Sequence, residues 1–138
     1  LMGFTTSFRM GQLLRYKFNP PEHLEYIDTY NYMVTDFIDA VRNCLKDGSF
    51  AQKDLEQESR GTFLVGYKGR LFKIYNDYQV EETVDNYNAI GCGEQIALGS
   101  LYSTKNTPPR ERIKIALEAA ERYSTGVNRP FKIIKGGG

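Results

Sequence analysis

The chain has 138 residues, of which 41% are hydrophobic and 25% charged, a balance that predicts one globular domain with an ordinary core. Its 18 basic and 17 acidic residues leave a net charge of +1, which gives no electrostatic case for nucleic acid or an acidic membrane as the main partner. No apolar run approaches the roughly 20 residues that span a bilayer, and no signal peptide is recognisable, so we expect a cytoplasmic protein without a membrane segment.

The two cysteines, Cys44 and Cys92, are isolated in the sequence and make no metal motif. We expect free thiols of a cytosolic protein and no metal or cofactor. The chain begins with Leu1-Met2-Gly3-Phe4, which resembles the inside of a strand, and ends with three glycines. We therefore expect one domain over 1–135 that lacks the beginning of its fold, followed by a flexible tail over 136–138.

The first elements are a strand and a short helix. Residues 1–5 are predicted to be the end of a buried strand, and Thr5-Thr6-Ser7 supplies the cap for a helix over 7–17. Phe18-Asn19-Pro20-Pro21 ends this helix because proline cannot continue it. Residues 22–27 are expected to be irregular or to form a single helical turn.

The clearest helix covers 28–46 and ends at Asp47-Gly48. Its apolar residues recur at the helical spacing i, i+3, i+4, i+7 and form one stripe: Tyr30, Met33, Val34, Phe37, Ile38, Val41, Cys44 and Leu45. A cysteine in such a stripe is expected to be a plain core residue, so Cys44 has no predicted chemical role.

The middle of the chain predicts a β-hairpin. Residues 49–60 are polar and are expected to hold a short helix or a loop. Two β-rich runs over 61–77 flank Lys68-Gly69, which is a good two-residue hairpin turn. A third strand is predicted over 87–90, and a helix over 94–103 follows it.

The last elements are a helix and a strand. Thr107 is the predicted cap of a helix over 108–123, in which proline is accepted in the first turn. Its buried stripe comprises Ile113, Ala116, Leu117 and Ala120. Ser124-Thr125-Gly126 ends this helix, and a final strand is predicted over 131–134. Strands grouped together, with helices in pairs on either side, predict an α+β fold with helical layers outside a sheet core.

Residues 87 to 93, Tyr-Asn-Ala-Ile-Gly-Cys-Gly, place a cysteine between two glycines at a predicted strand-to-helix turn. Such a turn exposes its side chain, and a helix N-terminus favours a thiolate, so Cys92 is a candidate nucleophile. A cysteine peptidase also needs a base, which is normally a histidine. The only histidine, His23, lies in a proline-rich segment, where we expect a solvated loop residue rather than a catalytic one.

Two other interpretations of this turn stay open. Gly91 and Gly93 before a helix are a weak signal for a phosphate cradle, because the third position of the dinucleotide fingerprint is Ile96 rather than a small residue. Alternatively, glycine allows close packing of the backbone and Cys92 is only a small filler.

Several motifs, in this order and spacing, resemble the proteasome β-subunit family, and the HslV-type bacterial peptidase most closely. Met2-Gly3-Phe4-Thr5 is similar to the family's Ala-Gly-Phe-Ala segment, which leads from a strand into a helix. The hairpin over 62–77 matches the family's central strand pair. Residues 89–93 are similar to its Ala-Ile-Gly-Ser-Gly turn, and residues 97–100 and 115–120 to the alanine-rich helices that follow.

The resemblance implies an N-terminal nucleophile hydrolase with an αββα sandwich. In that family the N-terminal threonine is the nucleophile and its amine is the base, assisted by an early lysine and an early aspartate. Carried over, the backbone N–H of Gly3 would help to hold the oxyanion. Cys92 would stand in place of the serine that hydrogen-bonds around the threonine amine, and Gly91 and Gly93 would border the substrate.

This sequence departs from the family pattern at two points. Residue 1 is leucine, and the family's threonine, aspartate and lysine lie on strands before the Gly-Phe segment. We therefore expect a proteasome-like domain that is incomplete at its N-terminus, inactive as a threonine peptidase in these 138 residues, and left with exposed sheet edges. Cys92 replaces serine, and a thiol is a weaker hydrogen-bonding group.

Three functional hypotheses follow. The first is the body of a self-compartmentalising threonine peptidase that acts on polypeptides, forms a homo-oligomeric ring and works with an ATP-dependent unfoldase. Its helices over 28–46 and 108–123 either make ring contacts or only cover the sheet. The second is a non-catalytic scaffold or ring subunit of the same fold. The third, outside the family, is an α+β domain that binds a small molecule or peptide.

Overall fold

A computed structural model describes residues 1–5, 7–48 and 61–136 and has a four-stranded antiparallel sheet at its centre. The strand order is β1-β2-β3-β4, and each strand pairs with the next one along the chain. The strands are β1 (Met2–Phe4), β2 (Phe63–Tyr67), β3 (Arg70–Ile74) and β4 (Val80–Glu82). The predicted α+β class is therefore confirmed.

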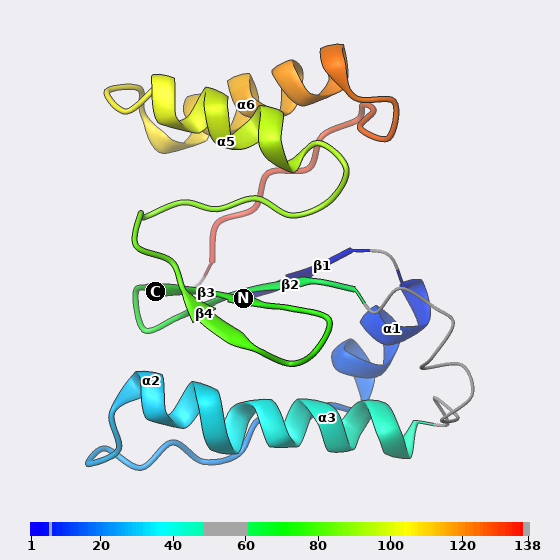
Figure 1. Cartoon of the computed structure of the whole chain (residues 1–138), viewed down its shortest axis with the longest axis vertical. Helices are drawn as coiled ribbons and strands as arrows, with labels where there is room; N and C mark the ends of the chain where they lie inside the picture. Colours follow the sequence, from blue (N-terminus) through cyan, green and yellow to red (C-terminus); the bar gives the residue numbers. More distant parts are fainter. Residues whose placement is uncertain (6, 49–60, 137–138) are drawn as a thin grey trace.

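Helices form a layer on each side of this sheet (Figure 1). One layer holds α1 (Phe8–Tyr16) and a long helix made of α2 (Thr29–Tyr32), the π-helical turn η1 (Met33–Phe37) and α3 (Ile38–Asp47). The other layer holds α5 (Glu94–Ser103) and α6 (Pro109–Tyr123), which pack against each other. In the described part of the chain, no helix is both long and apolar enough to cross a membrane.

The hairpin of β2 and β3 was correctly predicted. Tyr67 pairs with Arg70, so Lys68 and Gly69 are the two loop residues, and both have positive φ, 47° and 73°. Two consecutive positive φ values suit the tight turns whose twist matches that of the flanking strands.

The main core lies between the sheet and the layer of α1 and α3. One face of the sheet supplies its buried side chains to this core, and the helices supply theirs in return. The largest fully buried side chains are Phe63, Phe72, Leu13, Met33, Ile74 and Val41. The stripe predicted for 28–46 is confirmed at Phe37 and Leu45, whereas Tyr30 is 41% exposed and Cys44 is half-buried at the edge of the core.

The beginnings of two helices were partly mispredicted. Ser7 caps α1 by accepting a hydrogen bond from the Met10 N–H at 3.2 Å, as expected for part of the predicted cap. The strand before it was predicted to be buried, but Phe4 in β1 is exposed. Thr107 is not the cap of α6, because the N-cap position is occupied by Pro108 without a side-chain hydrogen bond. The predictions for Thr6, for 49–60 and for the end of the glycine tail fall outside the described residues.

The strand predictions for 87–90 and 131–134 were wrong, and β4 was missed. Neither 87–90 nor 131–134 has a strand assignment. Both segments instead run through the space between the sheet and the α5–α6 layer (Figure 1). A strand requires a partner backbone as well as β-forming residues, so the composition of these segments was not sufficient. Conversely, Val80-Glu81-Glu82 is too polar to be recognised but pairs with β3.

Candidate functional site

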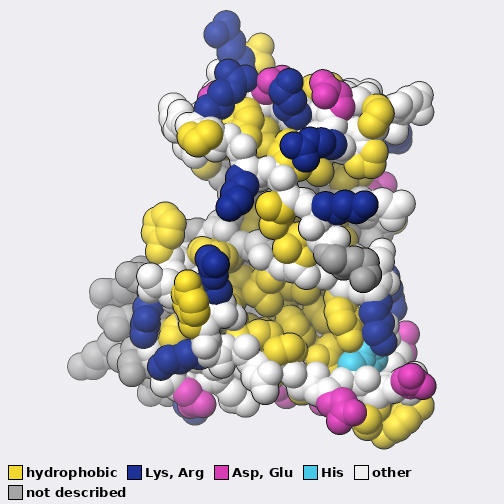
Figure 2. Space-filling model, turned by 180° about the vertical axis from the view of Figure 1, so that it is seen from behind, with side chains coloured by type: hydrophobic (Ala, Val, Ile, Leu, Met, Phe, Trp, Pro, Cys, Tyr) yellow, Lys and Arg dark blue, Asp and Glu magenta, His cyan; other side chains and the backbone are white. Residues whose placement is uncertain are grey.

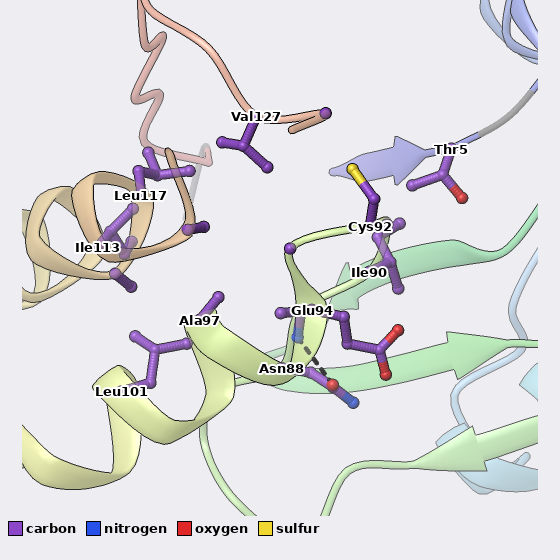
Figure 3. A pocket seen from close by; sticks show the side chains of 16 residues that line it. Thr5, Asn88, Ile90, Cys92, Glu94, Ala97, Leu101, Ile113, Leu117 and Val127 are labelled. Atoms are coloured by element: carbon purple, nitrogen blue, oxygen red, sulfur yellow. Dashed lines mark hydrogen bonds between the residues drawn. The ribbon is translucent and has the colours of Figure 1, made fainter. Parts of the chain in front are cut away.

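The candidate site is a cleft of about 700 Å³ between α5, α6 and the turn that precedes α5. Figure 3 shows Ala97, Leu101, Ile113 and Leu117 from the two helices on one side of the cleft, with Cys92 and Thr5 on the other. Its lining is mainly apolar, and its polar groups gather at the end nearest to the sheet. This is the usual composition of a ligand pocket.

The Gly91-Cys92-Gly93 turn needs both of its glycines. Gly91 has a φ of 102°, a region that L-residues with a side chain rarely adopt. Gly93 is buried, and a Cβ at this position would stand 2.8 Å from Val127 Cγ2 and 2.9 Å from Ala120 Cβ. The glycines therefore serve backbone conformation and close packing. This favours the close-packing interpretation over a phosphate cradle.

The turn also meets the N-terminal segment. A Cβ at Gly91 would be 3.4 Å from Thr5 Cγ2, so the two residues are close neighbours. Thr5 is itself held against the residue before β2, because its N–H donates to the Thr62 carbonyl at 3.1 Å. A Cβ at Gly61 would overlap the Thr5 carbonyl oxygen. Two motifs that lie far apart in the sequence are thus brought close together.

The thiol of Cys92 is exposed, and its sulfur lies against Gly126 in the loop after α6. His23 does not serve it as a base. The Nδ1 atom of His23 is 3.0 Å from Tyr67 Oη, and its Nε2 atom is 2.7 Å from the Ile27 carbonyl. Because a carbonyl only accepts, Nε2 carries the proton and, in the neutral ring, Nδ1 accepts from the tyrosine hydroxyl.

His23 is half-buried, and both of its ring nitrogens have hydrogen-bond partners. The prediction of a solvated loop residue was therefore wrong. Its ring stacks on Tyr32 with 4.3 Å between the centroids. Tyr67 follows Phe63 and Val65 on the core face of β2, which is the face turned away from α5 and Cys92. A cysteine–histidine pair of the peptidase type is not formed here.

The register of β1 bears on the predicted role of Gly3. Leu1 and Gly66 exchange both of their N–H···O bonds, at 3.0 and 2.9 Å, and Gly3 pairs with Leu64 two residues further along. In an antiparallel ladder every second pair is of this hydrogen-bonded kind. The N–H of Gly3 therefore points to β2, which argues against its use as an oxyanion donor.

A cluster of charged and phenolic groups that the sequence analysis did not identify lies on the sheet below the turn. Lys73 Nζ donates to Glu94 Oε1 at 2.6 Å and stands 5.3 Å from the ring centroid of Tyr75. The Tyr75 hydroxyl donates to the Glu81 carboxylate, and this bond, with a smaller contribution from burial, raises the pKa of Tyr75 to about 12. The hairpin pattern identified the strand of Lys73 but not what covers it.

Among the described residues, no group of three or more His, Cys, Asp or Glu side chains is arranged to hold a metal ion.

Comparison with known proteins gives the fold of the chain. No family model matches it, and no curated protein matches it. A solved structure of Thiobacillus denitrificans BPH superposes with a TM-score of 0.69 and 20% sequence identity, covering 94% of this chain and 70% of that chain. A second structure, of Thiobacillus denitrificans BPH in complex with Epoxomicin, has the same TM-score and coverage at 21% identity. The chain therefore has a fold similar to that of BPH.

Proposed function

We propose that this chain is the body of a self-compartmentalising threonine peptidase of the proteasome β-subunit and HslV type, with polypeptides as substrates. The observation that carries the proposal is the proximity of Thr5 to Gly91, at which a Cβ would lie 3.4 Å from Thr5 Cγ2. The resemblance requires the Gly-Phe segment and the Gly-Cys-Gly turn to meet at one active site, although they lie far apart in the sequence. Their proximity at the polar end of the cleft supports this requirement.

Two segments, unpaired within the described part of the chain, lie between the sheet and the α5–α6 layer and support an αββα sandwich as the complete fold. Segments 87–90 and 131–134 cross this space without a strand partner among the described residues (Figure 1). Backbone groups in such a position need hydrogen-bond partners. We propose that strands from outside these 138 residues pair with them as a second sheet and carry the nucleophilic threonine, together with the lysine and aspartate that assist it.

Within this proposal Cys92 is a neighbour of the nucleophile and not the nucleophile. Its thiol lies at the cleft without a histidine partner, which agrees with a small polar group beside the threonine amine. The amine of the threonine acts as the base, so no histidine is required. Gly91 and Gly93 border the substrate, while the oxyanion donor is an amide other than that of Gly3.

The assembly is part of the proposal. A homo-oligomeric ring would enclose the clefts, and the long helix of α2, η1 and α3 together with α6 would be available for ring contacts. An ATP-dependent unfoldase would deliver substrates. The complex of BPH with Epoxomicin provides a ligand for testing the cleft.

A second candidate is a non-catalytic ring subunit of the same fold. Two observations favour it, the cysteine in place of the family's serine and the Gly3 N–H that is directed into the sheet.

The two candidates are separated by an assay of the natural full-length product. We expect it to cleave a fluorogenic peptide and to be inhibited by Epoxomicin, and we expect an N-terminal Thr→Ala variant to assemble but lose all activity. An assembled wild-type ring that neither cleaves peptides nor binds Epoxomicin would favour the non-catalytic subunit.

A further inference from the structure

Lys73 is a buried charge at the penultimate position of β3, with 8% of its surface exposed. Its neighbours Phe72 and Ile74 enter the core against α1 and α3. Because side chains alternate along a strand, Lys73 lies on the opposite face of the sheet, which faces the α5–α6 layer. A lysine is almost never buried there without a partner, since removing its charge from water is costly.

The partner is Glu94, the first residue of α5, and it follows directly after the Gly91-Cys92-Gly93 turn. Its carboxylate side chain is 25% exposed. Its backbone N–H donates to the Gly91 carbonyl at 3.1 Å. Figure 3 shows its carboxylate directed away from the apolar wall formed by Leu101 and Ile113. Glu94 is therefore bonded to the turn through its backbone and to the sheet through its side chain.

The start of α5 has no side-chain cap, and its closest packing contacts are with α6 and the loop that follows α6. Its N-cap residue is Gly93, which has no side chain to cap the helix, and Gly91 is a residue with wide conformational freedom. Lys73, in contrast, is held on the sheet, where its cation also lies over the Tyr75 ring. A fixed cation on β3 thus ties to the sheet a turn whose closest packing contacts lie on the α6 side.

We propose that the Lys73–Glu94 ion pair is a positioning device, which sets the height of the Gly91-Cys92-Gly93 turn above the sheet. It thereby places Cys92 next to the groups that react. The catalytic consequence rests on the proposed function, whereas the placement of the turn does not. An ion pair is suited to this task because it is directional, while a hydrophobic pair of similar volume would stabilise the fold as well or better.

The placement is tested by the rate at which a maleimide reagent labels Cys92 in the natural full-length product, measured by mass spectrometry of its peptide. Glu94→Gln keeps the shape of the side chain and removes its charge, and Lys73→Met removes the cation. We expect each variant to change the Cys92 rate about tenfold through local loosening of the turn. The half-buried Cys44 serves as an internal reference and should keep its rate.

Two further variants make the result specific. The reversed pair Lys73→Glu with Glu94→Lys should return the Cys92 rate towards that of the wild type. Arg70→Met breaks another ion pair of β3, the 2.5 Å contact with Glu82, and should leave the Cys92 rate unchanged. If Lys73→Met does not fold, the Cys92 labelling rate of the isosteric Glu94→Gln variant decides whether the ion pair positions the turn.

The catalytic consequence is tested by steady-state kinetics on a peptide substrate. Glu94→Gln should lower kcat about tenfold with little change in KM, because a small displacement of a group beside the reacting atoms affects the transition state more than substrate binding. The reversed pair should recover kcat.

The inference is overturned if folded Glu94→Gln and Lys73→Met proteins both label Cys92 at the wild-type rate. If the wild type shows no peptidase activity but labelling responds as expected, the proposed function fails and the positioning role of the pair stands. If the wild type is active and labelling responds, an unchanged kcat in Glu94→Gln overturns the catalytic part alone.

Discussion

Gly126 lies directly against the thiol of Cys92, so closely that a Cβ at position 126 would overlap Sγ. The loop after α6 therefore bounds one side of Cys92, while Thr5 stands next to Gly91 in the same turn. The position of the cysteine is defined by contacts from both ends of the chain, although its surface is exposed.

We expect Gly126→Ala to destabilise the protein by about 1–3 kcal/mol, since the added methyl group must displace Cys92 or the loop. Urea unfolding measures this change. In a Cys92→Ala background the obstructing sulfur is absent, so the same substitution should cost much less, and the difference is the coupling energy of the two residues. Equal costs in the two backgrounds would show that the contact does not restrain the turn.

Substitution of Cys92 separates a neighbour of the nucleophile from the nucleophile itself. In the active full-length protein, Cys92→Ser should keep most of the peptidase activity, because serine restores the small polar group of the resembling family. Cys92→Leu should block the cleft sterically and abolish activity. Steady-state peptide hydrolysis measures both, and complete inactivation by Cys92→Ser would instead identify Cys92 as the nucleophile.

Phe37 tests the core. It is 7% exposed and makes an edge-to-face contact with Phe18, with ring centroids 5.4 Å apart. Phe37→Ala should therefore destabilise the fold by about 3–5 kcal/mol through lost burial and a residual cavity. The matched control is Phe8→Ala, because Phe8 is 85% exposed and its removal should change the unfolding free energy little. A loss below about 1 kcal/mol for Phe37→Ala would contradict this packing.

Tyr75 predicts a loss of stability at alkaline pH. The hydrogen bond to Glu81 retains its proton and raises its pKa from 10.0 to about 12, so the unfolded chain releases this proton at a lower pH than the native protein. The raised pKa of Tyr75 therefore stabilises the folded protein fully below about pH 10, and this stabilisation is lost as the pH rises to about 12. Urea unfolding across this pH range should show that the free energy of unfolding falls less steeply with pH in Tyr75→Phe than in the wild type.

Glu81→Gln provides the control for this assignment, because it removes the carboxylate that raises the pKa of Tyr75. Tyrosine ionisation is followed by ultraviolet absorbance, and the component that Tyr75→Phe lacks belongs to Tyr75. In Glu81→Gln this component should move to lower pH. An unchanged alkaline transition in both variants would mean that the Tyr75–Glu81 bond is not formed in solution.

The elements that were predictable from the sequence are those specified by local patterns. The helical stripe ending at Leu45 and the Lys68-Gly69 turn depend on neighbours within a few residues, and both were found. The segments 87–90 and 131–134 show the limit of this approach. Their β-forming residues lack a paired backbone among the described residues, and pairing is not encoded locally.

The site was predictable only in part. The two motifs that approach each other at Thr5 and Gly91 were recognised by their resemblance to a family, and their proximity required the structure. Lys73 and Glu94 gave no signal, since a lysine in a hairpin normally faces water and its burial depends on a helix that follows later in the chain. The bonding of His23 to Tyr67 likewise depends on a contact between distant segments.

The most direct test of the central claim is the N-terminal sequence and intact mass of the mature natural protein. The proposed function predicts an N-terminal threonine, with an aspartate and a lysine between it and Gly3. A mature protein whose first residue is not threonine would contradict the threonine peptidase and leave the chain without the proposed chemistry.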